Sequence, residues 1–345
     1  MSGLTPYTFS LYKKSNMSKK KILIVTHSRD NECIGHVTRF LEEAGAEVVR
    51  FNVDLYPLHH TLTTSYVDGD WKITLHTDGV AHELESLHAA WFRRAYNITG
   101  DLKDILDREF YQAAVGEIRQ TIFGMIEGLR CYTLGRPATY RRLDSKEQQL
   151  LVAREVGLMI PATCISNDAN DIRAFMDRVG GPVITKMQSS FAIYKEKTEH
   201  VVFTNQLEAA DADDLESVQY CPMVFQEKIE KKRELRITII GEKVFAFGVD
   251  SQQNEEAKLD WRKEGVALID KWEPFALPQE IHQKLLRLMS ILQIEYGAID
   301  IIIDPQDNYY FLEVNAAGEY FWLDRLCRHE ISQAIAGWLL AQGKN

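Results

Sequence analysis

The first part of the chain alternates short apolar runs with one stretch of helical periodicity. Residues 21–26 (KILIVT) are apolar enough for a buried parallel strand, and residues 46–51 predict a second strand. Between them, residues 30–44 place apolar side chains on one side of a helix that ends at Gly45. This β-α-β pattern predicts a small parallel sheet. The loop after the first strand lacks the glycines of a dinucleotide-binding fingerprint.

A hairpin and a further strand follow. Asp68-Gly69 is a hairpin turn signal, and residues 88–91 predict a strand whose end delivers Arg93 and Arg94.

A long helix ends this region. Residues 101–128 predict one helix, residues 130–134 predict a closing strand, and a glycine and a proline then mark a boundary. We therefore assign residues 17–137 to an N-terminal α/β domain and expect residues 1–16 to be a flexible tail.

The second region opens with a helix. Asp144, with Glu147 three residues later, is a capping pattern before an apolar stripe. Residues 182–187 (PVITKM) predict a strand that carries Lys186. We assign residues 138–222 to a central lobe.

The third region is mostly antiparallel. Residues 235–240 and 243–249 alternate in polarity around Gly241-Glu242, which is a hairpin signal. Residues 279–292 predict a helix, and an amphipathic helix closes the chain. We assign residues 223–345 to a C-terminal lobe.

A second hairpin in this region carries opposed carboxylates. Taking Asp304 and Tyr309 as the last pair beside the turn places Asp300 directly opposite Glu313. Asn315 then projects on the same face as Glu313, because side chains alternate along a strand. The other face is apolar and carries Ile299, Ile301, Ile303, Leu312 and Val314.

Opposed carboxylates destabilise a sheet by up to about 1 kcal/mol, so we expect something to offset their repulsion. A hard divalent cation held by Asp300, Glu313 and Asn315 would do so, since such ions prefer oxygen ligands. The alternative is a solvated hairpin face that binds nothing.

The overall composition limits the class of partner. The chain has 345 residues, 45% of them hydrophobic, and a formal net charge of −10, which disfavours general nucleic-acid binding. It has no apolar run of about 20 residues, so we expect no membrane partner. Five well-separated cysteines without a CxxC pair disfavour a disulfide framework or a zinc site and favour a reducing cytoplasm.

Three cations occupy positions that need an explanation. Lys146 falls in the first turn of its helix, where a cation is unfavourable by about 0.3–1 kcal/mol unless an anion binds there. Lys186 ends an apolar strand, and Arg236 shares a strand face with Ile240. Each has an ordinary alternative. Lys146 could be a surface lysine, the amine of Lys186 could simply reach water, and Arg236 could form a cross-strand salt bridge.

These cations precede the oxygen-ligand cluster, and that combination suits a nucleoside triphosphate with Mg²⁺. Phosphoryl transfer needs mainly positioning and charge neutralisation, which the set could provide. The sequence contains no H-E-x-x-H, G-x-S-x-G or G-x-x-x-x-G-K-[ST] motif, so a zincin, an α/β-hydrolase or a P-loop enzyme is disfavoured.

The order of these features resembles the ATP-grasp superfamily: two lysines, a hinge with the sequence FQEKI, Glu-Leu-Arg on a strand, then Asp and Glu-x-Asn. Most of residues 21–340 resembles the microviridin-type graspetide ligases within it, which crosslink side chains of a ribosomally made peptide. The similar stretches include ILIVTHSRDNE, SKEQQLLVAREVGLMIP, ITKMQSSFAIY, ELRITIIGE and FLEVNAAGEYFWL. The resemblance implies an α/β ATP-grasp fold with an N-terminal, parallel-sheet pre-ATP-grasp domain.

The resemblance also implies a role for each candidate residue, with ATP and Mg²⁺ as cofactors. Lys146 and Lys186 would contact the phosphates, and Arg236 would stabilise the transferring phosphoryl group. Mg²⁺ would be held by Asp300, Glu313 and Asn315. The adenine and ribose of ATP would be bound by Gln226, Glu227, Lys228 and Ile229 and by Glu234, respectively.

In that family, ATP phosphorylates an Asp or Glu side chain of the precursor, giving ADP and an acyl phosphate. A Ser or Thr hydroxyl or a Lys amine of the same peptide then closes a ring. The stretches SRDNE, WFRR and DWRKEG favour the ester-forming, macrolactone branch. The alternatives are an amide-forming ligase, a ligase that adds a free amino acid such as glutamate, and a nucleotide-binding partner without turnover.

Family members bind a leader segment of the precursor, often as a helix. The contacts that we expect for the peptide here are Arg93, Arg94, Phe191, Tyr194, Glu196 and Glu199. An ordinary charged surface hairpin is the alternative for the last four. A homodimer is a further expectation.

Overall fold

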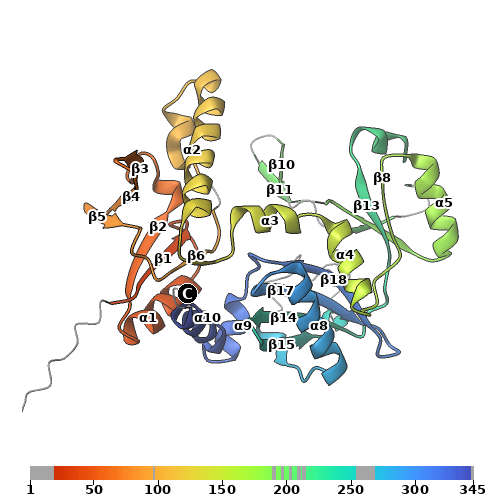
Figure 1. Cartoon of the computed structure of the whole chain (residues 1–345). Helices are drawn as coiled ribbons and strands as arrows, with labels where there is room; N and C mark the ends of the chain where they lie inside the picture. The colour runs from red at the N-terminus through yellow and green to blue at the C-terminus, as the bar shows by residue number, and fades with distance from the viewer. Residues whose placement is uncertain are drawn as a thin grey trace, which may run out of the picture.

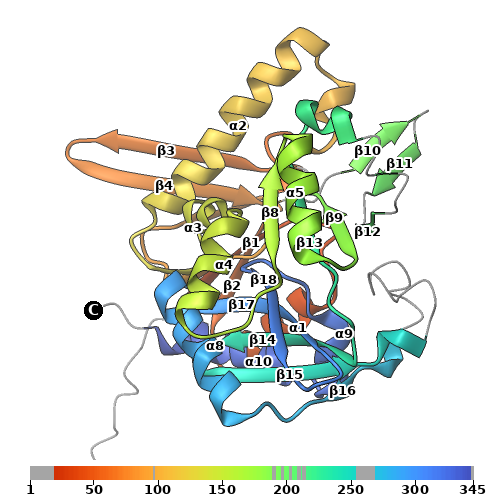
Figure 2. The same ribbon diagram turned by 90° about the vertical axis from the view of Figure 1, so that its right-hand side faces the viewer.

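The computed structural model describes residues 19–95, 98–188, 192–195, 198–201, 204–207, 211, 215–253 and 269–342. Three main sheets define an N-terminal lobe (β1 to β7), a central lobe (β8 to β13) and a C-terminal lobe (β14 to α10) (Figures 1 and 2). Among the described residues, no helix combines the length and apolar character needed to cross a membrane. The expected tail and the stretch DWRKEG lie outside the described residues.

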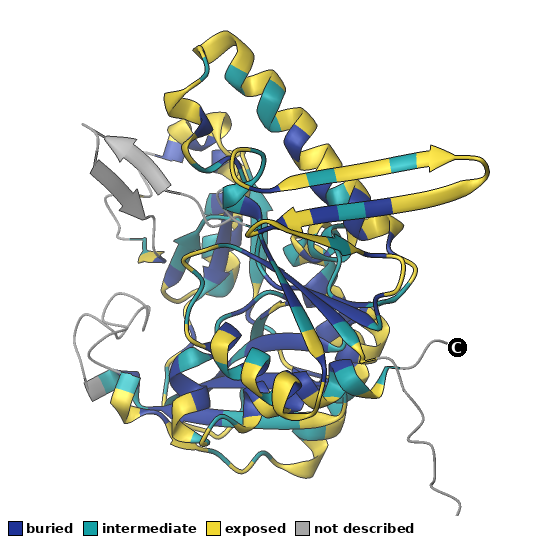
Figure 3. Ribbon diagram, turned by 90° about the vertical axis from the view of Figure 1, so that its left-hand side faces the viewer, coloured by how far each residue is buried: buried dark blue, intermediate teal, exposed yellow. Residues whose placement is uncertain are grey.

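The N-terminal lobe contains a parallel sheet in the order β2-β1-β6-β7 and a smaller antiparallel sheet, β3-β4-β5. Its elements are β1 (Lys21–Thr26), α1 (Cys33–Glu43), β2 (Glu47–Asn52), β3 (Thr61–Val67), β4 (Asp70–Thr77), β5 (Val80–Glu83), β6 (Ala89–Phe92), α2 (Arg108–Gly128) and β7 (Tyr132–Leu134). The predicted β-α-β opening is confirmed. The β3–β4 hairpin projects from the lobe with a largely exposed surface (Figure 3).

Two local predictions for this lobe have different outcomes. Val67 pairs with Asp70 across a two-residue turn in which Asp68 and Gly69 both have positive φ, as the turn signal predicted. The single helix predicted over 101–128 is wrong. A short 3₁₀ turn precedes α2, because the backbone of Asp107 is extended (ψ 147°) and the helix begins only after it.

The central lobe is a sheet in the order β12-β9-β13-β8, with α5 against it and a separate hairpin, β10–β11. Its elements are β8 (Thr163–Ser166), α5 (Ala169–Val179), β9 (Val183–Lys186), β10 (Ala192–Lys195), β11 (Thr198–Val201), β12 (Asn205–Gln206) and β13 (Met223–Glu227). Apolar side chains of α5, β9 and β13 form a core of their own, which includes Ile172, Phe175, Val183 and Phe225.

The C-terminal lobe is a five-stranded antiparallel sheet in the order β16-β15-β14-β17-β18. Its elements are β14 (Arg233–Ile240), β15 (Lys243–Val249), β16 (Glu273–Pro274), α8 (Gln279–Leu292), β17 (Tyr296–Ile303), β18 (Tyr309–Asn315), α9 (Phe321–Leu326) and α10 (Glu330–Ala341). The hairpin predicted around Gly241-Glu242 is confirmed, with Ile240 paired to Lys243.

The pairing of β17 with β18 corrects one prediction and confirms another. The last pair beside the turn is Ile303 with Tyr309, not Asp304 with Tyr309. A bulge shifts the register by one residue, so that Asp300 still faces Glu313 as predicted. Beyond the bulge, the side chains of β18 that face the core alternate the other way. Phe311 rather than Leu312 therefore packs in the core with Val314.

Two helices, α3 (Pro137–Leu143) and α4 (Lys146–Glu155), connect the N-terminal lobe to the rest of the chain. The capping pattern predicted from Asp144 is wrong by one residue. Ser145 is the N-cap, and its hydroxyl accepts a hydrogen bond from the backbone N–H of Gln148 at 3.2 Å. Lys146 is consequently the first helical residue. The apolar face of α4 packs with α8 and the C-terminal sheet, away from the central-lobe core.

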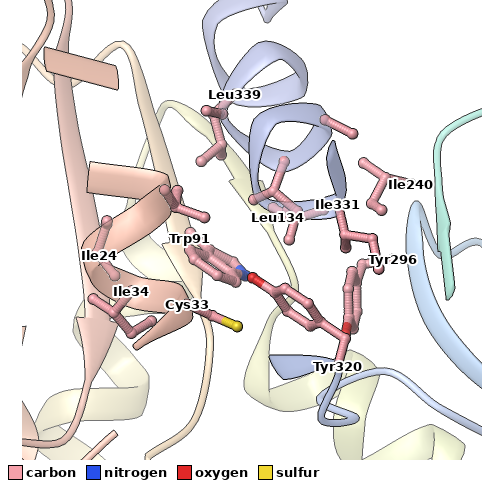
Figure 4. Close-up of a cluster of buried hydrophobic side chains, with 14 of the residues drawn as sticks. Ile24, Cys33, Ile34, Trp91, Leu134, Ile240, Tyr296, Tyr320, Ile331 and Leu339 are labelled. Atoms are coloured by element: carbon pink, nitrogen blue, oxygen red, sulfur yellow. The ribbon is translucent and has the colours of Figure 1, made fainter. Parts of the chain in front are cut away.

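The N-terminal and C-terminal lobes share one hydrophobic core. Trp91 and Ile34 of the first lobe pack in the same cluster as Tyr296, Tyr320 and Ile335 of the last. Figure 4 shows the ring of Tyr320 between those of Trp91 and Tyr296, and the tyrosine ring centroids lie 6.1 Å apart. Helix α10 accordingly lies beside α1, although the two are at opposite ends of the chain (Figure 1).

Candidate functional site

Three charged side chains form one row across the C-terminal sheet. Arg236 on β14 pairs with Asp300 on β17, which in turn pairs with Glu313 on β18. The next row contains Thr238 and Asn315 on either side of an alanine. Alternation along each strand therefore places the predicted metal ligands and Arg236 on the same face, opposite the apolar face that packs on α4 and α8.

Cations compensate the opposed carboxylates. The Nη1 atom of Arg236 lies 2.9 and 3.0 Å from the two carboxylate oxygens of Asp300. The Nζ atom of Lys146 lies 2.7 Å from Oε2 of Glu313. Lys146 therefore reaches the predicted ligand cluster from the first turn of α4, a position at which a carboxylate partner also offsets its unfavourable interaction with the helix dipole.

A glutamine that sequence reasoning missed ties α4 to the ligand strand. Gln149 is 5% exposed, and its Oε1 accepts the backbone N–H of Val314 at 2.8 Å. Its Nε2 donates to the carbonyl oxygen of Leu143 at 2.6 Å. Because Val314 lies between Glu313 and Asn315, this side chain fixes the backbone that carries both candidate ligands.

The remaining ATP-site candidates lie on the central sheet and in the segment after it. Lys186 is the last residue of β9 and faces Val224 on β13. Gln226 is buried on β13 and donates to the hydroxyl of Thr163 at 2.9 Å. The Nζ atom of Lys228 donates to Gln206 at 2.6 Å.

The predicted hinge connects the two sheets directly, because β13 ends at Glu227 and β14 begins at Arg233. Glu227 accepts the backbone N–H of Ala162 at 3.2 Å, and Ile229 is buried. This is the crossing point between the central and C-terminal lobes.

Glu234 lies two residues before Arg236, at the end of the charged face nearest the hinge. It is 7% exposed, and burial raises its pKa, while the ammonium of Lys231, 3.0 Å from Oε1, opposes that shift. A buried carboxylate with one cationic partner can accept hydrogen bonds from hydroxyl groups, which is the chemistry expected of a ribose contact.

The two arginines at the end of β6 reach the loop of residues 316–320, which follows Asn315. Arg93 is 1% exposed and donates to the carbonyl oxygens of Ala317 and Gly318 at 3.2 and 3.3 Å. It also binds Glu319 at 2.6 Å, and Arg94 pairs with the same carboxylate.

Arg236 holds this loop from the other side, through the carbonyl oxygen of Glu319 at 3.0 Å. Arginines of both lobes therefore bind this loop. Arg93 is thus buried and links the two lobes through this loop. Arg94 is the more accessible of the two predicted peptide contacts.

The other predicted peptide contacts are not placed by the structure. Phe191 and Glu196 lie outside the described residues. Tyr194 and Glu199 form a backbone pair in the β10–β11 hairpin, but their side chains also lie outside the description.

The donor set suits a hard divalent cation. Asp300, Glu313 and Asn315 offer carboxylate and amide oxygens on one face, and the carboxylates are 20% and 28% exposed. Lys146 and Arg236 beside them are suited to a polyanionic substrate. The arrangement suits a phosphate chain held between these cations and the strand that carries the candidate metal ligands.

Family models match nearly the whole chain. Residues 21–141 match the MvdD pre-ATP grasp domain, and residues 144–339 match the RimK-like ATP-grasp domain.

Solved structures and a curated relative agree with these matches. A Chryseobacterium gregarium RiPP-associated ATP-grasp ligase in complex with ADP, leader and core peptide is 50% identical, with TM-score 0.91 over 94% of this chain and 98% of that one. The macrocyclase MdnC of Microcystis aeruginosa, bound with its precursor peptide MdnA, is 38% identical, with TM-score 0.83 over 93% and 99%. The α-aminoadipate–LysW ligase LysX of Sulfurisphaera tokodaii is 26% identical over 68% of this chain and 80% of its own length.

The protein is an ATP-grasp enzyme, an ADP-forming ligase, and the predicted α/β fold with its pre-ATP-grasp domain is confirmed. Within that class, the chain belongs to the RiPP-associated ATP-grasp ligases, as the resemblance to microviridin-type ligases predicted. The predicted cofactors, ATP and Mg²⁺, are those of this enzyme class.

Proposed function

We propose that the protein activates Asp or Glu side chains of a ribosomal precursor peptide as acyl phosphates and joins them to Ser or Thr hydroxyls, forming macrolactone rings in microviridin-type biosynthesis. The observation that carries the proposal is the row of Arg236, Asp300 and Glu313, with Lys146 bound to Glu313. Relatives in which peptides are bound support the choice of substrate. Five free cysteines, none of them paired, support a cytoplasmic location.

Each site residue has a part in this reaction. Lys146 and Lys186 bind the phosphates of ATP, and Arg236 stabilises the charge that develops during phosphoryl transfer. The segment Gln226 to Ile229 receives adenine, and Glu234 accepts hydrogen bonds from the ribose. A Mg²⁺ ion held by Asp300, Glu313 and Asn315 supplies further neutralisation of the phosphate charge when bound.

The second half of the reaction uses the peptide itself. A carboxylate becomes a good leaving group once it is phosphorylated, and the hydroxyl that attacks it belongs to the same chain. Holding both groups in one site replaces a bimolecular encounter by a local one, which raises the effective concentration of the nucleophile. Arg94 and the β10–β11 hairpin are proposed to hold the peptide.

Mass spectrometry of a cognate precursor peptide tests the proposal. Incubation with enzyme, ATP and Mg²⁺ should release ADP and remove one water per ring, and mild alkali should reopen the rings because esters hydrolyse readily. Rings that join Lys and resist alkali would assign the amide-forming alternative. Incorporation of labelled free glutamate would assign an amino-acid-adding ligase, and absence of ADP release would leave a nucleotide-binding partner.

A further inference from the structure

A charged side chain of the N-terminal lobe is buried at the junction with the C-terminal lobe. Arg93 directly follows β6 and is 1% exposed. Its guanidinium carbon lies 5.8 Å from the ring centroid of Trp91 and 5.4 Å from that of Tyr320, two rings that Figure 4 shows within the core shared by these lobes. A buried charge is costly unless it is paired and hydrogen-bonded, so the partners of Arg93 must offset its burial.

The partners of Arg93 lie mainly in the loop of residues 316–320. Its Nη1 donates to the carbonyl oxygens of Ala317 and Gly318 at 3.2 and 3.3 Å, and its Nη2 lies 2.6 Å from Oε2 of Glu319. Three acceptors in one loop match the planar fork of a guanidinium, whereas the compact ammonium of a lysine does not match that spacing. Arg93 thus holds the main chain of this loop as well as one of its side chains.

The same loop forms one wall of the position that Arg236 occupies. The carbonyl oxygen of Glu319 accepts a hydrogen bond from Nη2 of Arg236 at 3.0 Å. Gly318 packs so closely that a Cβ atom added there would lie 2.9 Å from the same Nη2 and closer still to the Cβ of Ala298. The close approach therefore requires glycine at position 318, and a shift of this main chain would move the guanidinium.

The remaining contacts show how much of this wall depends on Arg93. The Nη1 atom of Arg236 binds the carboxylate of Asp300, which is itself a candidate metal ligand. The carbonyl oxygen of Glu319 lies outside that ligand set, so it can hold the guanidinium independently of it. Within the C-terminal lobe, the hydroxyl of Tyr296 donates to the carbonyl oxygen of Gly318 at 2.6 Å. Tyr296 thus binds one acceptor of the loop, whereas Arg93 binds three.

We propose that Arg93 is a positioning residue for phosphoryl transfer, which acts by holding the guanidinium of Arg236 through the loop of residues 316–320; this inference rests on the proposed function. In that step, a carboxylate oxygen of the precursor attacks the γ-phosphorus of ATP, and ADP leaves with the electron pair of the broken P–O bond. Preorganised cations stabilise the charge that develops, and a misplacement of about 1 Å can slow a reaction by about 10²-fold. The N-terminal lobe is therefore part of the phosphoryl-transfer machinery.

Arg93→Lys and Gly318→Ala test the proposal from the two sides of the loop. Arg93→Lys keeps the charge but loses the fork, and Gly318→Ala pushes against Arg236 without altering Arg93. With precursor peptide as substrate, we expect the kcat of ADP release, counted per ATP site in calorimetry, to fall by about 10–10²-fold in both. The Kd of ATP, the KM of the peptide and the number of rings formed per ADP should stay within about twofold of wild type, because only the first step is slowed.

Two substitutions elsewhere are matched controls. Arg50→Lys removes hydrogen bonds to Asn52 and to the carbonyl oxygen of His27, both within the N-terminal lobe. Gly337→Ala adds a methyl group on α10 that would meet nothing within 4 Å among the described residues, apart from the helix's own backbone. Both controls should release ADP at near wild-type rates.

Several results would overturn the proposal. An unchanged kcat in Arg93→Lys would do so, and if that variant does not fold, an unchanged kcat in Gly318→Ala decides against it. A loss confined to the KM of the peptide would make Arg93 a peptide contact, and a loss explained by fewer ATP sites per chain, or matched by Arg50→Lys, would make its role purely structural. If the wild-type enzyme releases no ADP with the precursor, the proposed function itself fails.

Discussion

We expect Gln149 to hold α4 to β18, the strand that carries the candidate metal ligands Glu313 and Asn315. Gln149→Met keeps the length of the side chain but removes both hydrogen bonds, leaving the N–H of Val314 and the carbonyl of Leu143 without their partner. An unsatisfied buried polar group costs about 1–3 kcal/mol, so we expect the free energy of unfolding to fall by roughly 2–4 kcal/mol. Urea unfolding followed by tryptophan fluorescence measures this loss.

The same substitution should weaken the nucleotide site, because Val314 lies between Glu313 and Asn315. We expect half-maximal ADP release to require more Mg²⁺ than in the wild type. Gln148→Met is the matched control. Its backbone N–H bonds to Ser145 and is unaffected by the substitution, so its stability should stay within about 0.5 kcal/mol. If both variants show the same stability and the same Mg²⁺ requirement, Gln149 does not hold α4 to β18.

Three further outcomes are expected. Glu313→Ala or Asp300→Asn should abolish ADP release while circular dichroism stays near native, and full activity in either would remove the metal assignment. Lys186→Ala should weaken ATP binding in calorimetry, whereas unchanged affinity would leave a lysine that merely reaches water. Hydrogen bonding to Arg325 lowers the pKa of Glu32 from 4.5, so Arg325→Gln should lower the free energy of unfolding at neutral pH. That difference, read from urea titrations, should vanish as the pH falls through the lowered pKa; a pH-independent difference would contradict it.

Local patterns in the sequence were informative wherever a short stretch decides the structure. The turns at Asp68-Gly69 and Gly241-Glu242 follow from turn chemistry and strand alternation alone. The facing of Asp300 and Glu313 was predicted from a last pair that is one residue off, and it holds because the bulge compensates for that shift. The bulge near Leu312 was not predictable in this way, because it depends on how Phe311 fills the core beneath the sheet. The end of the hairpin was therefore placed one residue too far along.

Contacts between segments far apart in the chain could not be predicted from the sequence. Nothing near Arg93 in the sequence indicates that its guanidinium binds the carboxylate of Glu319, more than two hundred residues later. An arginine in an otherwise apolar strand end is equally compatible with a peptide contact and with a buried tie. Gln149 is similar, since a glutamine on a helix is usually solvated and only the fold brings it against an open strand edge. Sequence reasoning thus predicted that Asp300 faces Glu313 but missed the groups that hold this row in place.

The separate core of the central lobe determines which parts of the enzyme can move independently. The apolar cluster around Phe175 and Phe225 shares no residue with the clusters of the other lobes among the residues that the structure describes, whereas Trp91 and Tyr320 bind the first and last lobes into one body. Among the described residues, rotation of the central lobe about residues 228–232 would leave these apolar clusters intact, while it would break contacts such as the hydrogen bond from the N–H of Phe311 to the carbonyl oxygen of Met159. Such a movement would therefore let nucleotide enter and products leave without exposing a hydrophobic core, and it need not lower the stability of the row of Arg236, Asp300 and Glu313.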